Sequence, residues 1–316
     1  MSFSFSSVHS AGSLIHVRLS AGLFFLAFAG ACHALDPDPR RWNHLPVGSN
    51  FIGAAYVYTE ADIYIDPVLL LEDVNMEKQS WAFAYVHAFE LLGKSARIDV
   101  AQAYQKASWT GLLEGVPAST SRSGWSDTVV RLGVNLYGAP PLSGKKFSDY
   151  RAQQKVETIV GAGLVVRLPT GHYEADKLVN LGENRFVFMP QLGIVHNRGQ
   201  WTTELTGEVE IFTDNDSFYN GNTLEQKPMY IAIAHIMRSF NPGQWIGVSF
   251  GAEYGGENTV NGVDKDDTKH NVGWALTYSH PVNRQAGVKI KYIGINKKEF
   301  TGYHSNTLML SGVFSW

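Results

Sequence analysis

The chain ends in an alternating stretch, Thr307-Leu308-Met309-Leu310-Ser311-Gly312-Val313-Phe314-Ser315-Trp316, whose final residue is aromatic. Successive side chains of a β-strand point to opposite faces, so residues two apart share a face. Phe314 and Trp316 therefore lie on the same side of the chain. The stretch predicts a terminal β-strand that carries bulky aromatic side chains on one face.

The same two-residue period recurs in other segments. Residues 81–89 (WAFAYVHAF) and 272–279 (VGWALTYS) alternate bulky apolar residues with small ones, and residues 203–211 (TELTGEVEI) alternate carboxylates with apolar residues. Such alternation predicts β-strands with two different faces. In a secreted β-sandwich the large residues would share an internal core. Large aromatic residues opposite small ones instead favour a wall whose outer surface covers lipid.

The chain contains about twelve such stretches. They begin near Ser49, Ser80, Ala96, Asp127, Val156, Arg185, Gln200, Met229, Trp245, Asn271, Gln285 and Thr301. Short connections rich in turn residues (92–95, 197–199, 241–243, 281–284) alternate with long polar ones (61–79, 108–124, 169–183, 213–227, 255–270). Short turns on one side and long loops on the other are typical of an outer-membrane barrel. The connection 138–154 is long where a short turn is expected, so it is either a periplasmic excursion or a miscounted strand.

Residues 1–34 are interpreted as an export signal, which leaves residues 35–316 as the barrel. Arg18 supplies a positive charge, and residues 19–31 (LSAGLFFLAFAGA) are apolar but too few to span a bilayer as a helix. Cleavage after Ala34 or after Ala31 fits the small residues present there. Cys32 is the only cysteine, and cleavage after Ala34 removes it. Lipidation of Cys32 is the alternative, because residues 29–32 (AGAC) partly match a lipoprotein signal.

The composition excludes two further classes of protein. The formal net charge of −3 (26 Lys and Arg against 29 Asp and Glu) becomes about −4 without Arg18 (25 against 29), which gives no sign of nucleic-acid binding. After the signal, no stretch approaches 18 apolar residues, so helical membrane spans are excluded. The sequence predicts an all-β fold, a single transmembrane antiparallel β-barrel of about 12 strands.

The most distinctive internal sequence is residues 167–173 (RLPTGHY) followed by residues 178–185 (LVNLGENR). It resembles the signature LPTG-x-Y and N-x-G-x-N-R of the MetA-pathway of phenol degradation family, which consists of outer-membrane channel proteins. The resemblance extends from about Asn43 to Trp316. It implies a barrel that passes small, often hydrophobic or aromatic, molecules inward.

The residues of this motif also have a structural explanation. Pro169 cannot donate a ladder hydrogen bond, and Gly171 permits a positive φ in a turn. Asn180 and Asn184 can bond the loop backbone. The predicted loop motif comprises Pro169, Thr170, Gly171, Asn180, Gly182 and Asn184. A loop folded over the mouth of the barrel and a merely ordered hairpin are both compatible with it.

If the large apolar residues face lipid, alternation assigns a set of polar residues to the lumen. This set is Arg131, Asn135, Arg167, Arg185, Gln191, Glu204, Glu208, Glu210, Glu253, Lys289 and Lys291. Charges inside a barrel can line a water-filled channel and set its selectivity, with carboxylates favouring cations. They can equally pair across the barrel and close it. A barrel of about twelve strands is intermediate in width, so both alternatives stay open.

The sequence gives little support for a catalytic or metal site. The eleven histidines show no metal-ligand spacing. Ser279-His280 and His304-Ser305 are the only adjacent Ser–His pairs, and neighbours in a strand point to opposite faces. The loop 261–267 (NGVDKDD) lacks the complete spacing of a calcium loop. We expect no catalytic residue, no metal and no cofactor.

These observations predict a passive outer-membrane channel for small molecules. The alternatives are an outer-membrane enzyme that hydrolyses lipid or peptide, and a structural barrel with a filled lumen. The expected partners are outer-membrane lipid, a small-molecule solute and the barrel-assembly machinery, which would read Phe314 and Trp316 as an assembly signal. No nucleic-acid partner is expected.

Overall fold

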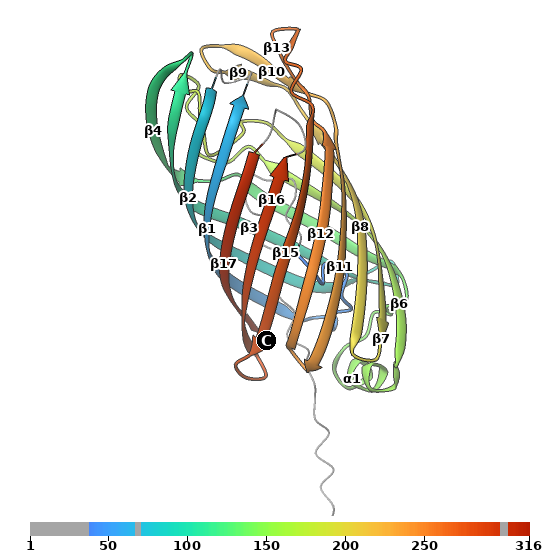
Figure 1. Ribbon diagram of the computed structural model, residues 1–316. Helices are drawn as coiled ribbons and strands as arrows, with labels where there is room; N and C mark the ends of the chain where they lie inside the picture. The colour runs from blue at the N-terminus through green and yellow to red at the C-terminus, as the bar shows by residue number, and fades with distance from the viewer. Residues whose placement is uncertain (1–37, 67–70, 298–302) are drawn as a thin grey trace, which may run out of the picture.

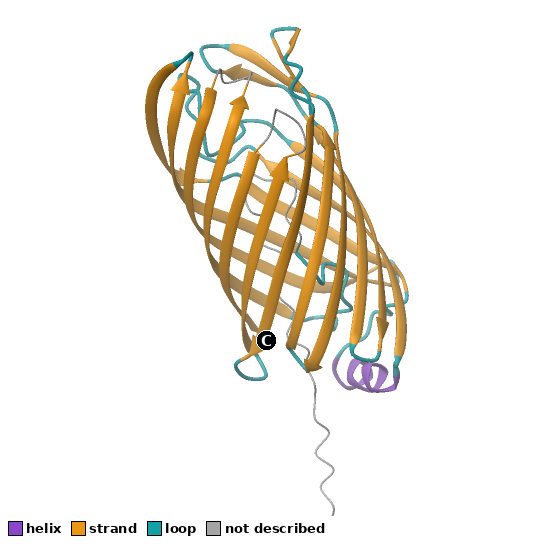
Figure 2. Cartoon of the chain, viewed as in Figure 1, coloured by secondary structure: helices purple, strands orange, loops and turns teal. Residues whose placement is uncertain are grey.

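The first and last strands pair with each other and close the sheet into a barrel. The computed structural model describes residues 38–66, 71–297 and 303–316, so the export signal and Cys32 lie outside the described residues. Strand β17 (Tyr303–Ser315) runs antiparallel to β1 (Asn50–Asp66), with Phe51 opposite Ser315. Figures 1 and 2 show the resulting closed wall. Closure leaves no unpaired edge in the ring, as a membrane barrel requires.

The described part of the chain forms twelve strand positions around the wall. They are built by β1, β2 (Leu71–Leu91), β3 (Lys94–Leu113), β4 (Val116–Trp125), β5 (Thr128–Tyr137), β6 (Val156–Leu168), β7 (Val187–Arg198), β8 (Trp201–Phe212), β11 (Met229–Asn241), β12 (Gln244–Gly255), β15 (Lys269–Pro281), β16 (Ala286–Lys297) and β17. Strands β4 and β5 share one position, because β3 pairs with β4 along one half of its length and with β5 along the other. The predicted transmembrane antiparallel barrel of about 12 strands is confirmed.

The turns and loops separate into two ends. The turn end contains the connections 92–93, 199–200, 242–243 and 282–285, together with Trp316. The helix α1 (Gly144–Gln153) also lies there (Figure 2), so residues 138–154 are an excursion rather than a miscounted strand. The loop end carries a small sheet of β9 (Asn215–Phe218), β10 (Asn222–Gln226), β13 (Asn258–Val260) and β14 (Val263–Asp264). In outer-membrane barrels the turn end is periplasmic.

Two of the predicted long loops are wrong. Segments 61–79 and 108–124 are mostly strand, because β2 and β3 are 21 and 20 residues long and β4 continues beyond a two-residue turn. A crossing needs only about 10 residues, so these strands extend past the membrane at the loop end. The outward residues of the extension, such as Asn75, Glu77 and Gln79, are exposed and polar, so the apolar outward face that marks a spanning strand is lost there.

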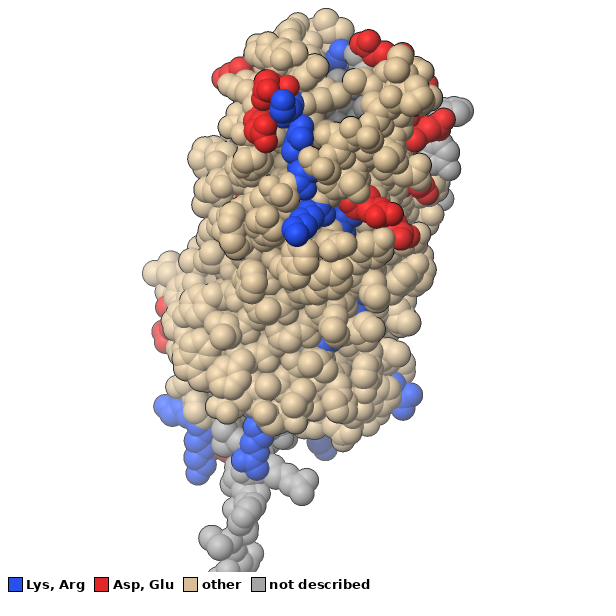
Figure 3. All heavy atoms as spheres, turned by 90° about the vertical axis from the view of Figure 1, so that its left-hand side faces the viewer, with Lys and Arg blue, Asp and Glu red and all other residues tan. Residues whose placement is uncertain are grey.

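The outer surface carries the apolar face of nearly every strand. Leu276 is 45% exposed, whereas its neighbour Thr277 is 0% exposed and faces inward. On the face shown in Figure 3, Lys, Arg, Asp and Glu gather toward the two ends and a broad middle zone is largely free of them. Among the described residues, no helix is long and apolar enough to cross a membrane. The outer surface is matched to a lipid bilayer with water at both ends.

We predict that the loop end faces outward from the cell. A tag inserted beside Gly221 or Gly262, which lie at exposed turns of the small sheet, should be labelled on intact cells. Asn215 is a poorer site, because its buried amide bonds Tyr173 and the Glu183 carbonyl. A tag beside Pro242 should be labelled only after the outer membrane is permeabilised. Labelling of Pro242 on intact cells would show the reverse orientation.

Candidate functional site: the lumen and its inner segment

Residues 38–49 cross the interior of the barrel before the chain enters β1, and we call them the inner segment. Asp38 contacts β16, Arg41 contacts β8, and Val47 donates a backbone hydrogen bond to Leu142 near α1. Strands β16 and β8 are separated by three other strands in the wall. The inner segment therefore spans the lumen from one side to the other.

Asp38 forms a buried ionic contact with β16. Its Oδ1 lies 2.7 Å from Lys289 Nζ and 3.4 Å from Lys291 Nζ. Burial raises the pKa of Asp38, but the two ammonium groups outweigh that effect and hold the pKa below its usual value. A carboxylate here is stable because it is paired with cations inside a low-dielectric interior.

Arg40 and Arg41 attach the inner segment to glutamates of β8. The backbone amides of Arg40 and Arg41 donate to the two carboxylate oxygens of Glu204 at 3.0 and 3.2 Å. The Arg41 guanidinium lies 3.0 Å from Glu208. Burial lowers the pKa of Arg40 to about 10, which leaves this arginine protonated at neutral pH. The carboxylate row on β8 thus holds both backbone and side chains of the inner segment.

Trp42 fills a recess in the wall made by glycines. A Cβ at Gly193 or Gly161 would come within 1.9 or 2.3 Å of the Trp42 ring, so only glycine fits under it. The indole Nε1 donates to Thr206 Oγ1 at 2.9 Å, and the Arg131 guanidinium lies 4.7 Å from the ring centroid. An indole that is packed, hydrogen-bonded and covered by a cation is a strong anchor.

His44 anchors the inner segment at the turn end. Its Nε2 lies 2.7 Å from the Pro140 carbonyl oxygen, which fits an Nε2–H donor. Phe147 and Tyr150 of α1 contact the imidazole ring edge-on, at centroid distances of 4.8 and 5.3 Å. The excursion 138–154 therefore has a structural role: it packs against the inner segment from below.

A chain of polar contacts continues from the inner segment around the wall. Arg97 and Arg131 both bond Asp99 Oδ2, at 2.7 and 3.2 Å, and Arg131 Nε donates to Gln191 at 3.1 Å. Gln191 in turn donates to Glu208. Arg97 and Arg131 share the carboxylate of Asp99, and Glu208 pairs with Arg41 of the inner segment.

The structure places all the predicted lumen residues on the inner side. Those buried to 9% exposure or less are Arg131, Asn135, Arg185, Gln191, Glu204, Glu208, Glu210, Glu253, Lys289 and Lys291, and the Arg167 side chain is 12% exposed. They form separate groups rather than one ring. Lys289 and Lys291 meet Asp38, Glu204 and Glu208 meet the inner segment, and Glu253 bonds Asn271. Their role in selectivity stays a prediction.

A second charged group lies at the loop end. Glu183 is bonded by Arg167 and by Arg185, the latter at 3.1 Å, and Arg167 lies 4.0 Å from Glu210. Burial raises the pKa of Glu183, but the two guanidinium groups reverse the effect and lower the pKa to about 2. This group joins the loop 169–186 to the inner wall.

The predicted loop motif forms a fixed loop, attached at its two ends by Asp127. Asp127 accepts hydrogen bonds from the amides of Gly171 and Glu183, both at 2.8 Å. A Cβ at Gly171 would lie 2.7 Å from the Asp127 nitrogen, so this glycine is needed for close approach and not, as the sequence suggested, for a positive φ. Asp127 itself was not predicted as a site residue, since nothing in its local sequence shows its distant partners.

The remaining motif residues hold the loop internally and to the small sheet. The Asn180 side chain accepts a hydrogen bond from the Glu174 amide and donates one to the Glu174 carbonyl. Thr170 Oγ1 accepts from the Thr128 amide at 2.9 Å. Asn184, at φ 55°, donates to Asn215 at 2.9 Å. The motif loop is therefore tied to both the wall and the neighbouring loops, which favours a structured cover over an isolated hairpin.

One row of side chains resembles a catalytic arrangement. Glu204, His235 and Ser249 lie opposite one another on β8, β11 and β12, and His235 Nδ1 is 2.7 Å from Ser249 Oγ. The sequence missed this pair because the two residues are 14 positions apart. Both Glu204 oxygens accept hydrogen bonds from the inner segment, so this carboxylate anchors the segment instead of orienting His235. Among the described residues, no cluster of His, Cys, Asp or Glu side chains could hold a metal ion.

Comparison with known proteins decides the family. The model of the MetA-pathway of phenol degradation family matches residues 67–309. The chain belongs to this family. The family resemblance inferred from the LPTG motif is therefore confirmed. No curated protein matches the sequence.

Solved structures share the fold of this family member. The COG4313 outer membrane channel from Pseudomonas putida F1 is similar over 89% of this chain and 100% of its own, with a TM-score of 0.76 and 21% identity. The β domain of the Bordetella autotransporter BrkA (85% and 100% covered, TM-score 0.45, 8% identity) and the CymD monoaromatic hydrocarbon channel (86% and 89%, 0.42, 7%) are more distant. The first of these supports the barrel fold.

We predict that acid loosens the motif loop through Glu183. A carboxylate whose pKa is lowered on folding stabilises the folded loop above its ordinary pKa of 4.5, and this contribution is lost as pH falls toward 2. Amide hydrogen exchange in residues 169–186, corrected for intrinsic rates, should rise over that window in the wild type. In the Glu183→Gln variant, the amides of residues 169–186 should exchange fast at both the high-pH and the low-pH end of this window. A wild-type loop equally protected at pH 5 and pH 2 would contradict this role.

Proposed function

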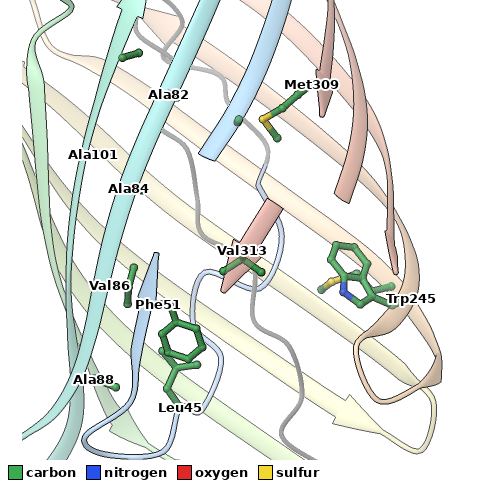
Figure 4. Packing of buried hydrophobic residues seen from close by; sticks show 13 residues of the cluster. Leu45, Phe51, Ala82, Ala84, Val86, Ala88, Ala101, Trp245, Met309 and Val313 are labelled. Atoms are coloured by element: carbon green, nitrogen blue, oxygen red, sulfur yellow. The ribbon is translucent and has the colours of Figure 1, made fainter. Parts of the chain in front are cut away.

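We propose that the protein is a passive outer-membrane channel for small apolar or aromatic molecules. The observation that carries the proposal is an apolar zone on the inner face of the barrel. Its members are Leu45, Phe51, Ala55, Ala82, Ala84, Val86, Ala88, Ala101, Ala103, Met237, Trp245, Met309 and Val313, most of them visible in Figure 4. A channel for hydrophilic solutes would place polar groups along this wall.

The apolar zone lies mainly on β1, β2, β3 and β17, whereas the charged contacts lie mainly on β3 and on β5 to β8. A second inward apolar group, Met229, Ile231, Ile233, Ala275, Ile293 and Ile295, continues toward the loop end on β11, β15 and β16. The apolar groups at both levels of the lumen provide a surface against which an apolar solute can be desolvated. Family membership supports the same substrate class.

The inner segment controls the width of the lumen in this proposal. Beside Arg41, Trp42 and Leu45 the cavity holds only about 10 Å³, roughly the space of one water molecule. A solute of aromatic size requires the inner segment to shift. A structural barrel with a filled lumen is the second candidate, and the dense pairing of the inner segment favours it. We propose no catalytic activity, because the Ser249–His235 pair is buried beside the anchored Glu204.

The export and assembly of the chain are part of the proposal. We infer cleavage of the signal near Ala34 and insertion by the barrel-assembly machinery, with outer-membrane lipid around the wall. Phe314 and Trp316 are exposed at the turn end and stack with centroids 6.1 Å apart.

Trp316→Ser should reduce the amount of heat-modifiable protein in the outer membrane, whereas Trp125→Ser, at another exposed aromatic, should not. Equal amounts of the two variants in the outer membrane would show that Trp316 is not part of the assembly signal.

We predict that Trp42→Ala opens the lumen. Loss of the indole removes the Thr206 hydrogen bond and the packing on Gly161 and Gly193, so the inner segment should release and single-channel conductance should rise several-fold. Trp201→Ala removes the same side chain from the outer surface, where it is exposed, and should leave conductance unchanged. Unchanged conductance in a folded Trp42→Ala protein would favour the filled structural barrel.

The substrate class needs its own test. A deletion strain should grow poorly on a limiting aromatic carbon source, grow normally on a sugar of porin size, and recover with the wild-type gene. Purified protein in liposomes should show passive uptake of the same aromatic compound without an energy source. Normal growth on the aromatic source, or hydrolysis of lipid or peptide by the purified protein, would refute the channel proposal.

A further inference from the structure

The outer wall is hollowed near the turn end, across β16, β17, β1, β2 and β3. The hollow has a volume of about 820 Å³ and is lined almost entirely by apolar groups. Ala54 and Gly312 lie in it, directly opposite each other across the β1–β17 pairing. Ile52, Phe83 and Phe314 are large, exposed and outward-facing around this small pair. The depression therefore results from two small residues within a wall of large ones, at the seam where the barrel closes.

The hollow lies at the level of one membrane leaflet. Ile52 is two residues from the start of β1, and Phe314 is two residues from the end of the chain. Val282, which also lines the hollow, belongs to the turn between β15 and β16. These positions place the hollow in the half of the wall next to the turn end, which is the periplasmic leaflet. That leaflet of an outer membrane consists of phospholipid.

Polar groups border the hollow on its turn-end side. Tyr85, which lines the hollow, donates from its hydroxyl to Asn50 Oδ1 at 2.8 Å, and His87 Nδ1 lies 2.9 Å from the same oxygen. Arg284 is exposed in the same turn as Val282. An arginine at the membrane interface pairs well with a phosphate, and aromatic and imidazole groups suit the same depth.

We propose that the hollow is a binding site for one phospholipid molecule. An acyl chain occupies the apolar depression over Ala54 and Gly312, and the phosphate lies toward Arg284 and His87. A second copy of the chain is a poorer occupant, because two convex barrel walls in contact would leave the depression empty, and an unfilled apolar void is unfavourable. The bound lipid covers the β1–β17 seam, so it should stabilise the closed barrel by binding the folded state alone.

The chain offers a matched control for this site. Ala232 and Gly207 form an identical cross-strand pair on the outer face of β11 and β8, away from the hollow. A Cβ at Gly312 meets only the Gly287 oxygen, at 3.9 Å, and a Cβ at Gly207 meets nothing within 4 Å. Larger side chains can therefore be placed at both glycines without a clash.

The experiment compares lipid retention by the purified protein. Native mass spectrometry in a mild detergent, with added dioleoyl phosphatidylglycerol, should show one retained lipid in the wild type and in Ala232→Phe and Gly207→Leu. Ala54→Phe and Gly312→Leu should lose it, together with the rise in thermal unfolding temperature that the lipid produces. Arg284→Gln should weaken binding of the same lipid at least several-fold while its barrel stays heat-modifiable.

Three results would overturn the proposal. Equal retention by the hollow variants and the control variants would show that lipid binds without regard to the depression. Retention of lipopolysaccharide in place of phospholipid would put the site in the other leaflet. A wild-type dimer in light scattering that Ala54→Phe converts to a monomer would make a second copy the occupant. None of these outcomes bears on the conductance or uptake that tests the channel.

Discussion

Satisfaction of backbone hydrogen bonds within a closed ring is the constraint on which the rest of this structure depends. No water is present in a lipid core to bond an exposed amide or carbonyl, so a strand wall must close on itself. Here β17 meets β1 over thirteen residue pairs from Phe51–Ser315 to Ile63–Tyr303. Once the ring is closed, every spanning strand has one face in lipid and one in the lumen, and the two-residue alternation of the sequence follows. Leu276 outside and Thr277 inside show the result within one strand.

Closure also places charged side chains inside the barrel, where the inner segment supplies partners for them. Lys289, Lys291 and Glu204 point inward because of their strand parity, into an interior that leaves each of them 3% exposed or less. Unpaired charges in such a space are strongly disfavoured. Asp38 pairs with both lysines of β16, and the amides of Arg40 and Arg41 donate to the Glu204 carboxylate of β8. The inner segment is thus held by inward-facing charges of the wall.

The sequence allowed the wall to be predicted and not what fills it. Periodicity is a local property, so alternation in stretches such as 272–279 gave the strands, the inward residues and the end of the chain. The inner segment has no period, and its contacts join residues such as Asp38 and Lys289 that are 251 positions apart. Trp42 gave no signal either, because its recess is made by Gly161 and Gly193 on two other strands. The extensions of β2, β3 and β4 resemble loops in sequence, because outward residues such as Asn75, Glu77 and Gln79 are polar and the apolar face is lost there.

The distribution of charge inside the barrel explains how an apolar solute and a charged lumen are compatible. Opposed, unpaired rows of Glu and Arg would produce a field across the lumen and favour polar solutes. In the structure, Glu208 pairs with Arg41 and accepts a hydrogen bond from Gln191. Arg131 pairs with Asp99, so these charges contact groups of opposite sign. On the other side, the cluster from Ala82 to Val313 provides apolar surface, interleaved with buried polar side chains such as Gln105 and Ser311. Trp42 and Arg41 attach the inner segment to β8, and Asp38 attaches it to β16, so release of these contacts would widen the lumen. The passage that opens would then be lined by the alanines of β2 and β3, whose small side chains leave the most room.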